Sequence, residues 1–150
     1  ASIGGADGLG KQFAKLVELG GEMQCLSDPL IRDRLAAIEA RVLAHRSSSC
    51  RIFSCQAAGD DAGPITLMMK LLLTEIGHDM ALLALDMLGE AALLEPETGR
   101  GAVRGPNKWL DQIMGSLGNS IAGGASNIQR NIIAERGLGL PRDLALSGER

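Results

Sequence analysis

Aromatic residues are scarce in this sequence of 150 residues: they make up 2% of it, with a single tryptophan and no tyrosine. Hydrophobic residues nevertheless reach 45% and charged residues 22%, close to the averages of globular domains, which argues against wholesale disorder. The core must therefore be built from leucine, isoleucine, methionine and alanine, most of which favour helices over strands. The composition predicts an all-α protein of about one domain.

The sequence also lacks an excess of positive charge. Its formal net charge is −3 and its isoelectric point is near 5.4, so it offers no basic field for a nucleic acid. No run reaches the roughly 18 uninterrupted apolar residues of a membrane span, and no signal-peptide pattern opens the chain. Cys25, Cys50 and Cys55 are odd in number and show no CxxC spacing, so we expect reduced thiols in a cytoplasmic protein.

The chain divides into one expected domain and two short ends. Residues 1–10 are rich in glycine and are expected to form a flexible terminus, and residues 143–150 a C-terminal tail. Residues 11–142 then form the domain. Its pattern predicts an up-and-down helical bundle with four main helices and a short C-terminal helix.

Caps and breakers set the bounds of these helices. The clearest start is at Pro29, because Ser27 or Asp28 can accept a hydrogen bond from a free N–H and proline needs no N–H in the first turn. The apolar stripe of that helix comprises Leu30, Ile31, Leu35, Ile38, Val42 and Leu43. Three helices are expected from about Lys11 to Leu26, from Pro29 to about Arg46 and from Ile65 to Leu88. A fourth is expected from Pro106 or Asn107 through Leu117, and a fifth from a cap at Ser126 or Asn127 to Gly137. Residues 47–64 and 89–107 are expected mainly as loops.

The segment from Ile65 to Leu88 is apolar on nearly every side. Its exception is one narrow polar strip, in which a polar residue recurs every four positions: Thr66, Lys70, Thr74 and His78. A helix of this kind must be surrounded by other helices, so we expect it to be the central helix of the bundle.

Motifs for metal or hydrolytic chemistry are weak in this sequence. Glu75 and His78 form a Glu-x-x-His pair, but a bundle that binds two metal ions needs such a pair on each of two helices. The other histidine, His45, has no carboxylate three residues earlier. We therefore expect no metal site, and His78 to meet solvent or a neighbouring helix. No G-x-S-x-G elbow and no P-loop pattern occurs.

The glycine pair Gly123-Gly124 permits two interpretations. It can be an ordinary connection between helices, followed by a serine cap. Alternatively, a glycine pair before a helix lets backbone N–H groups come close to a ligand, in a field that favours anions or electron-rich rings. The residues alone leave both interpretations open.

The same region carries a family resemblance. The stretch GGASNIQRNIIAERGLGLPRD from residue 123 resembles the C-terminal signature of acyl-CoA dehydrogenases, where a Gly-Thr-Ser-Glu-Ile-Gln-Arg-Asn-Ile-Ile-Ala-Glu-Arg run leads into Leu-Gly-Leu-Pro-Arg. DPLIRDRLA at 28–36, KLLLTEIGHDMALLALDMLGEAALL at 70–94 and Trp109 are similar to the same domain in the same order.

The resemblance implies the C-terminal helical bundle of a longer flavoprotein, whose full-length form uses FAD to dehydrogenate the α,β bond of an acyl-CoA thioester. The isolated bundle is expected to be inactive, because the middle β-domain that holds much of the flavin and substrate has no counterpart here. Members associate through their bundles, so a homo-oligomer or hetero-oligomer is expected. An alternative role is a non-catalytic assembly module or partner subunit of a dehydrogenase complex.

The resemblance also implies cofactor-binding positions: Asp86, Gly89, Gly123, Gly124, Ala125 and Asn127. Several of them depart from the family pattern. Gly123 stands where several members carry the catalytic glutamate, so no catalytic residue is assigned. Ala125 replaces the threonine that approaches the flavin. Asp86 and Glu90 replace the glutamine and second glycine of a Gln-x-x-Gly-Gly segment that meets the FAD of a neighbouring subunit, and two acids there would repel a pyrophosphate. Whether this chain binds FAD therefore stays open.

Overall fold

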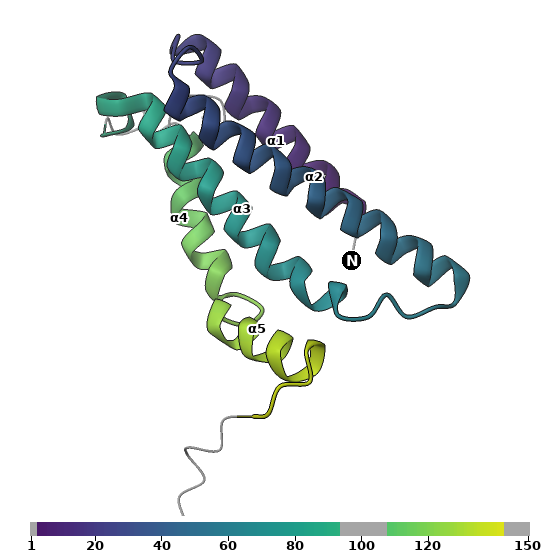
Figure 1. Ribbon diagram of the computed structural model, residues 1–150. Coiled ribbons are helices and arrows are strands. Elements are labelled where there is room, and N and C mark those ends of the chain that lie inside the picture. Colours follow the sequence, from purple (N-terminus) through teal and green to yellow (C-terminus); the bar gives the residue numbers. More distant parts are fainter. Residues whose placement is uncertain (1–2, 94–107, 143–150) are drawn as a thin grey trace, which may run out of the picture.

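A computed structural model describes residues 3–93 and 108–142, and in those ranges the chain forms helices and no strand. Helices α1 (Ile3–Glu22) and α2 (Pro29–Ala58) form an antiparallel hairpin, and α3 (Ile65–Leu88) returns alongside them (Figure 1). Helix α4 (Lys108–Ile121) packs on α3, and α5 (Ser126–Ile132) follows after a tight turn. This arrangement confirms the predicted all-α, up-and-down bundle.

Two helices are longer than the sequence predicts. Helix α1 begins at Ile3 rather than near Lys11, so the helix takes in most of the segment 1–10 that was expected to be flexible, and it ends at Glu22 rather than Leu26. Leu9 is buried against the core, and this packing outweighs the free-energy cost of placing the nearby glycines in a helix.

The tail 143–150 and most of the expected loop 89–107 lie outside the described residues. Gly89–Leu93 forms a 3₁₀ turn.

Helix α2 continues past the predicted end at Arg46 to Ala58. Its serine-rich part remains helical and buries Ile52 and Ser49. The buried hydroxyl of Ser49 is satisfied within the helix, because it donates to the carbonyl of His45 at 3.0 Å. The helix ends at Gly59, whose φ of 79° is left-handed and whose N–H reaches back to the last turn. The predicted start is confirmed, since Asp28 accepts from the N–H of Leu30 at 2.8 Å.

Helix α5 keeps its predicted end but not its predicted cap. It passes into a π-helical turn, Ile133–Gly137, so Gly137 closes the helical stretch as expected. The capping position is Ala125, however, and no side chain caps the first turn, so the prediction of a cap at Ser126 or Asn127 is wrong.

The core lies between α1, α2 and α3, and Trp109 closes it from α4. Helix α3 contacts every other helix, which confirms its predicted central place. Leu16, Ile76, Met80 and Leu83 are fully buried. The predicted stripe of α2 is wrong at Leu30 and Leu43, which are 74% and 53% exposed.

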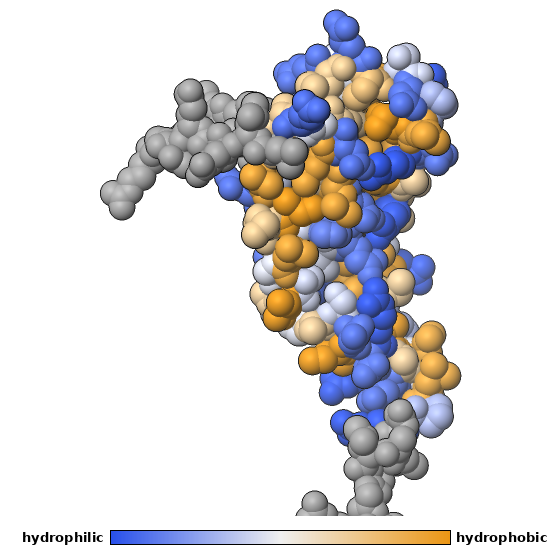
Figure 2. All heavy atoms as spheres, turned by 90° about the vertical axis from the view of Figure 1, so that its left-hand side faces the viewer, coloured by the Kyte–Doolittle hydropathy of each residue, from blue (hydrophilic) through white to orange (hydrophobic). Residues whose placement is uncertain are grey.

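The surface retains apolar side chains of its own. Figure 2 shows them gathered on the face that carries α4. Three lie on one side of that helix, where Met114, Leu117 and Ile121 are 64%, 49% and 72% exposed. None of the helices in the described ranges has the length and apolar character needed to cross a membrane. The three cysteines are free thiols.

Candidate functional site

The turn between α4 and α5 is built on two glycines in a left-handed conformation. Gly123 has φ 68° and Gly124 has φ 107°, values that strain any residue with a side chain. A Cβ on Gly124 would lie 2.7 Å from Nε2 of Gln129, whereas one on Gly123 would meet nothing within 4 Å. The backbone of the turn therefore favours glycine at both positions, and a side chain at Gly124 would also displace the amide of Gln129.

Side chains from two helices hold the carbonyl groups of this turn. Lys70 of α3 donates from Nζ to the carbonyl of Gly124 at 2.7 Å and to that of Ser120 at 3.3 Å. Gln129 of α5 donates to the carbonyl of Gly123 at 3.0 Å. The turn is thus tied both to the central helix and to the helix that follows it.

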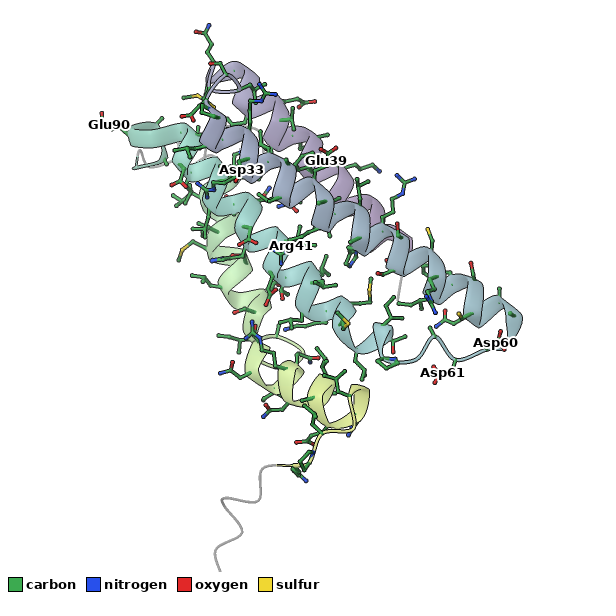
Figure 3. The ribbon with its side chains drawn as sticks, in the orientation of Figure 1. Asp33, Glu39, Arg41, Asp60, Asp61 and Glu90 are labelled. Atoms are coloured by element: carbon green, nitrogen blue, oxygen red, sulfur yellow. The ribbon has the colours of Figure 1, made fainter. Side chains whose placement is uncertain are left out.

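A cleft of about 320 Å³ opens beside the turn, between α2, α3, α4 and α5. Charged side chains cross it. Arg41 of α2 pairs with Asp79 and, at 3.2 Å, with Glu75. The other oxygen of Glu75 accepts from Arg130 of α5 at 2.7 Å. In Figure 3, Arg41 lies between α2 and α3. Two guanidinium groups thus balance two carboxylates, so the cleft carries no net charge from these four groups.

His78 also lines this cleft. The hydroxyl of Ser116 on α4 lies within hydrogen-bond distance of two groups, the carbonyl of Ile113 at 2.7 Å and Nδ1 of His78 at 2.8 Å. The second of these contacts joins α3 to α4. The prediction that His78 meets a neighbouring helix is confirmed. No group of three potential metal ligands occurs in the described part of the chain.

Asp86 and Gly89, the other predicted cofactor-binding positions, lie at the opposite end of α3. From Lys70 to Asp86 the helix rises about 24 Å at 1.5 Å per residue. Asp86 pairs with Arg34 of α2 at 2.5 Å, and both side chains are largely exposed. Figure 3 shows Glu90 at this same far end of the molecule. The structure therefore brings Gly123, Gly124, Ala125 and Asn127 together and separates them from Asp86 and Gly89.

The two ends differ in how well they suit a flavin dinucleotide. The glycine turn suits a close approach, because its carbonyls are held by the protein and the space around Gly123 is open. The far end does not suit a pyrophosphate, because Asp86 and Glu90 are exposed carboxylates and only Asp86 has an arginine partner among the described residues.

Sequence reasoning missed the contacts that hold this site together. Lys70 stood out as a member of a polar strip, but the spacing on one helix carries no information about a turn 54 residues later. Glu75 stood out only in the Glu-x-x-His pair with His78, and the arginine partners of Glu75 and Asp79 come from α2 and α5. Only the fold brings these pairs together.

Comparison with known proteins agrees with this geometry. Residues 12–138 match the family model described as acyl-CoA dehydrogenase, C-terminal domain. The chain therefore belongs to the acyl-CoA dehydrogenase family through this helical domain, which confirms the resemblance. It is 34% identical over 134 residues to acyl-CoA dehydrogenase IpdE1 of Mycolicibacterium smegmatis, covering 89% of this chain and 31% of that protein. It is 32% identical to IpdE1 of Mycobacterium tuberculosis over 136 residues, covering 89% of this chain and 32% of the relative.

Solved structures show the same fold. A variant of the Tcur3481-Tcur3483 steroid ACAD superimposes with a TM-score of 0.74 at 26% identity, covering 94% of this chain and 37% of the other. The unmodified Tcur3481-Tcur3483 steroid ACAD gives a TM-score of 0.70 at 23% identity, covering 90% of this chain and 35% of the other. The chain thus spans about a third of the length of the curated relatives that it matches.

Proposed function

We propose that this chain is the C-terminal bundle of an FAD-dependent acyl-CoA dehydrogenase, in which the Gly123-Gly124 turn contacts the flavin edge and the acyl thioester. The observation that carries the proposal is the turn itself: two left-handed glycines whose carbonyls are held by Lys70 and Gln129 in the part of the chain that matches the family. When bound, FAD supplies the hydride acceptor. The residues of this chain position and shield it but supply no assigned base, so the isolated bundle is inactive.

We further propose a steroid-derived acyl-CoA as the substrate of the complete enzyme. The proposal is supported by the similarity of this chain to a solved structure of a steroid ACAD variant. A groove of about 760 Å³ between α1, α3 and α4 reaches Ala122, next to the turn. The lining of this groove includes Gly8, Gly77 and Gly115, positions where an added Cβ would meet no atom within 4 Å. Such a groove has room for a bulky group.

An FAD titration tests the proposal. Visible absorbance of the flavin should change saturably on addition of the purified chain. Quenching of Trp109 is a poorer readout, because this side chain is 6% exposed and packs in the core with Leu88, toward the Asp86 end. Gly124→Val should weaken binding, since it fills and strains the turn, and Gly59→Val at the end of α2 is the control, because it places a side chain on a left-handed glycine away from the turn. Absence of saturable binding by the unmodified chain would contradict the flavin contact.

The acidic far end offers a second test of the flavin proposal. The double variant Asp86→Gln, Glu90→Gly restores the side chains of the family segment. Removing two negative charges from a pyrophosphate contact should tighten FAD binding on the order of tenfold. The double variant Asp33→Asn, Glu39→Gln, which removes two exposed carboxylates from α2, is the control for net charge alone. Equal affinities of the double variant and the unmodified chain would mean that this end meets no dinucleotide.

The second candidate function is an assembly module or partner subunit of a dehydrogenase complex. The exposed stripe Met114, Leu117 and Ile121 on α4 favours it, because contiguous apolar surface marks contact with another protein surface. The similar steroid ACAD carries two designations in its name, Tcur3481 and Tcur3483. Light scattering of the purified chain tests this role. Self-association that Leu117→Glu abolishes supports assembly through α4, and a monomer contradicts self-assembly.

We place the protein in the cytoplasm, a proposal that its free thiols support.

A further inference from the structure

The polar strip of α3 has a use that its spacing does not reveal. Thr66 and Thr74 bond to carbonyls of their own helix or of the turn just before it. His78 and Lys70 instead reach across to other elements, His78 to Ser116 of α4 and Lys70 to the turn. The strip is therefore a polar seam between α3 and the α4–α5 segment, and Lys70 is its contact with the glycine turn.

Lys70 differs from the other cations of the site in having no carboxylate partner among the described residues. Arg41 and Arg130 are both engaged by acids of α3. The half-buried ammonium of Lys70 is instead satisfied by two main-chain carbonyls, those of Gly124 and Ser120. Removing an ammonium group partly from water costs free energy, and carbonyl acceptors offset that cost only when the hydrogen-bond geometry is good. The contact therefore holds both the Lys70 side chain and the two carbonyl groups in place.

Holding the Gly124 carbonyl also fixes the direction of the next N–H. The peptide bond between Gly124 and Ala125 is trans and planar, so its N–H points opposite to its carbonyl. With that carbonyl directed at Lys70, the N–H of Ala125 points away from the bundle. No hydrogen bond from this N–H occurs within the described ranges. The donor is thus free on the outer face of the turn.

We propose that Lys70 is a positioning residue: by holding the Gly124 carbonyl, it sets the turn so that the free N–H of Ala125 faces the ligand. The inference rests on the proposed function, because that function supplies the ligand, the flavin with its acyl thioester. It adds a residue from the middle of the chain that acts on the flavin contact through one peptide group.

The test compares Lys70→Met, Lys70→Arg and the control Arg46→Met, which removes an equal charge from an exposed side chain of α2. The first readout is hydrogen exchange at the N–H of Gly124, which bonds to the carbonyl of Ile121 within the turn. Lys70→Met should raise this exchange rate on the order of tenfold, because a charged hydrogen bond is lost. Lys70→Arg, which can still donate to both carbonyls, should restore it, and Arg46→Met should leave it unchanged. Unchanged exchange in Lys70→Met would overturn the inference.

The second readout is FAD affinity in the same four proteins, and it separates this inference from the proposed function. Weaker binding in Lys70→Met with recovery in Lys70→Arg supports positioning, because a merely structural loss of charge would not be rescued in this way. Equal binding in Lys70→Met despite faster exchange overturns the link between turn and ligand. If the unmodified chain binds no FAD, the proposed function fails, and the exchange data alone then decide whether Lys70 holds the turn.

Discussion

Arg130 on α5 donates from Nη2 to Oε1 of Glu75 on α3 over 2.7 Å. The same carboxylate accepts from Arg41 of α2 through its other oxygen. One side chain of the central helix therefore links the long helix α2 to the short helix that follows the glycine turn. Seven residues are too few for a stable isolated helix, so α5 depends on contacts of this kind.

Replacing Glu75 by glutamine should destabilise the fold by about 1 kcal/mol, because two charge-assisted hydrogen bonds are weakened at a carboxylate that is one-third exposed. Urea unfolding measures the change in the free energy of unfolding. Glu39→Gln on α2, an exposed carboxylate without an ion-pair partner among the described residues, is the matched control and should change stability little. A double-mutant cycle with Arg130→Met isolates the link to α5, and a coupling energy of zero would contradict it.

Replacing Gly124 by alanine should destabilise by about 2 kcal/mol, because the left-handed φ is strained for alanine and the new Cβ displaces Gln129. Gly123→Ala meets no atom and should cost about half as much. In contrast, Gly77→Ala lies within α3 with open space at its Cβ, and it should stabilise by about 0.5–1 kcal/mol. Thermal or urea unfolding of the three variants checks this order, and a reversed order would contradict the turn geometry.

His45 predicts a dependence of stability on pH. It is 4% exposed, its Nδ1 has no hydrogen-bond partner in the described structure, and burial lowers its pKa from the ordinary value of 6.5. The unfolded chain therefore binds a proton more readily than the folded one. Stability from this residue is complete above pH 6.5 and is lost as the pH falls below 6.5 toward the folded pKa, by at most about 1.4 kcal/mol per pH unit.

The substitution His45→Leu removes this titrating group without leaving a large void. The free energy of unfolding is measured for both proteins at about pH 7.5 and about pH 5.5, on either side of the ordinary histidine pKa. Between these two pH values, the variant should lose less stability than the unmodified protein. A loss of equal size in both proteins would assign the effect to other groups.

Two neighbouring leucines of α3 test where the core lies. Leu83 is fully buried and Leu82 is 39% exposed, although both occupy the same apolar run. Leu83→Ala should cost about 3 kcal/mol, through lost burial and the cavity it leaves, and Leu82→Ala about 1 kcal/mol or less. Equal losses in urea unfolding would mean that another surface covers Leu82, as in an oligomer.

The sequence predicts the elements of this fold better than their extents. Ile65–Leu88 is found at its predicted bounds, because a continuous apolar pattern between a proline and a glycine is a local signal. The end of α2 at Ala58 was missed, because serine lowers helix propensity on average while Ser49 bonds to its own helix. The exposure of Leu30 follows from which helices lie beside α2, and no local pattern contains that information.

The site was predictable only in part, for the same reason. Gly123 and Gly124 are recognisable in the sequence because their left-handed backbone requires glycine. Their link to Lys70 depends on the path of α3 beneath the turn, and the resemblance groups Asp86 with them as a cofactor-binding position although it lies at the other end of that helix. Proximity in space between residues far apart in the chain requires the structure.

The position of α3 has a consequence for how the molecule opens. Helices α1, α2 and α3 share nearly the whole buried core, whereas α4 and α5 rest mainly on one side of α3. Apart from Trp109, the described α4–α5 segment adds no member to that core cluster. We therefore expect it to form a less stable cooperative unit, which detaches at a free energy below that of global unfolding while the three-helix remainder keeps its packing. On this expectation, the glycine turn belongs to the half of the domain that can move without unfolding the rest.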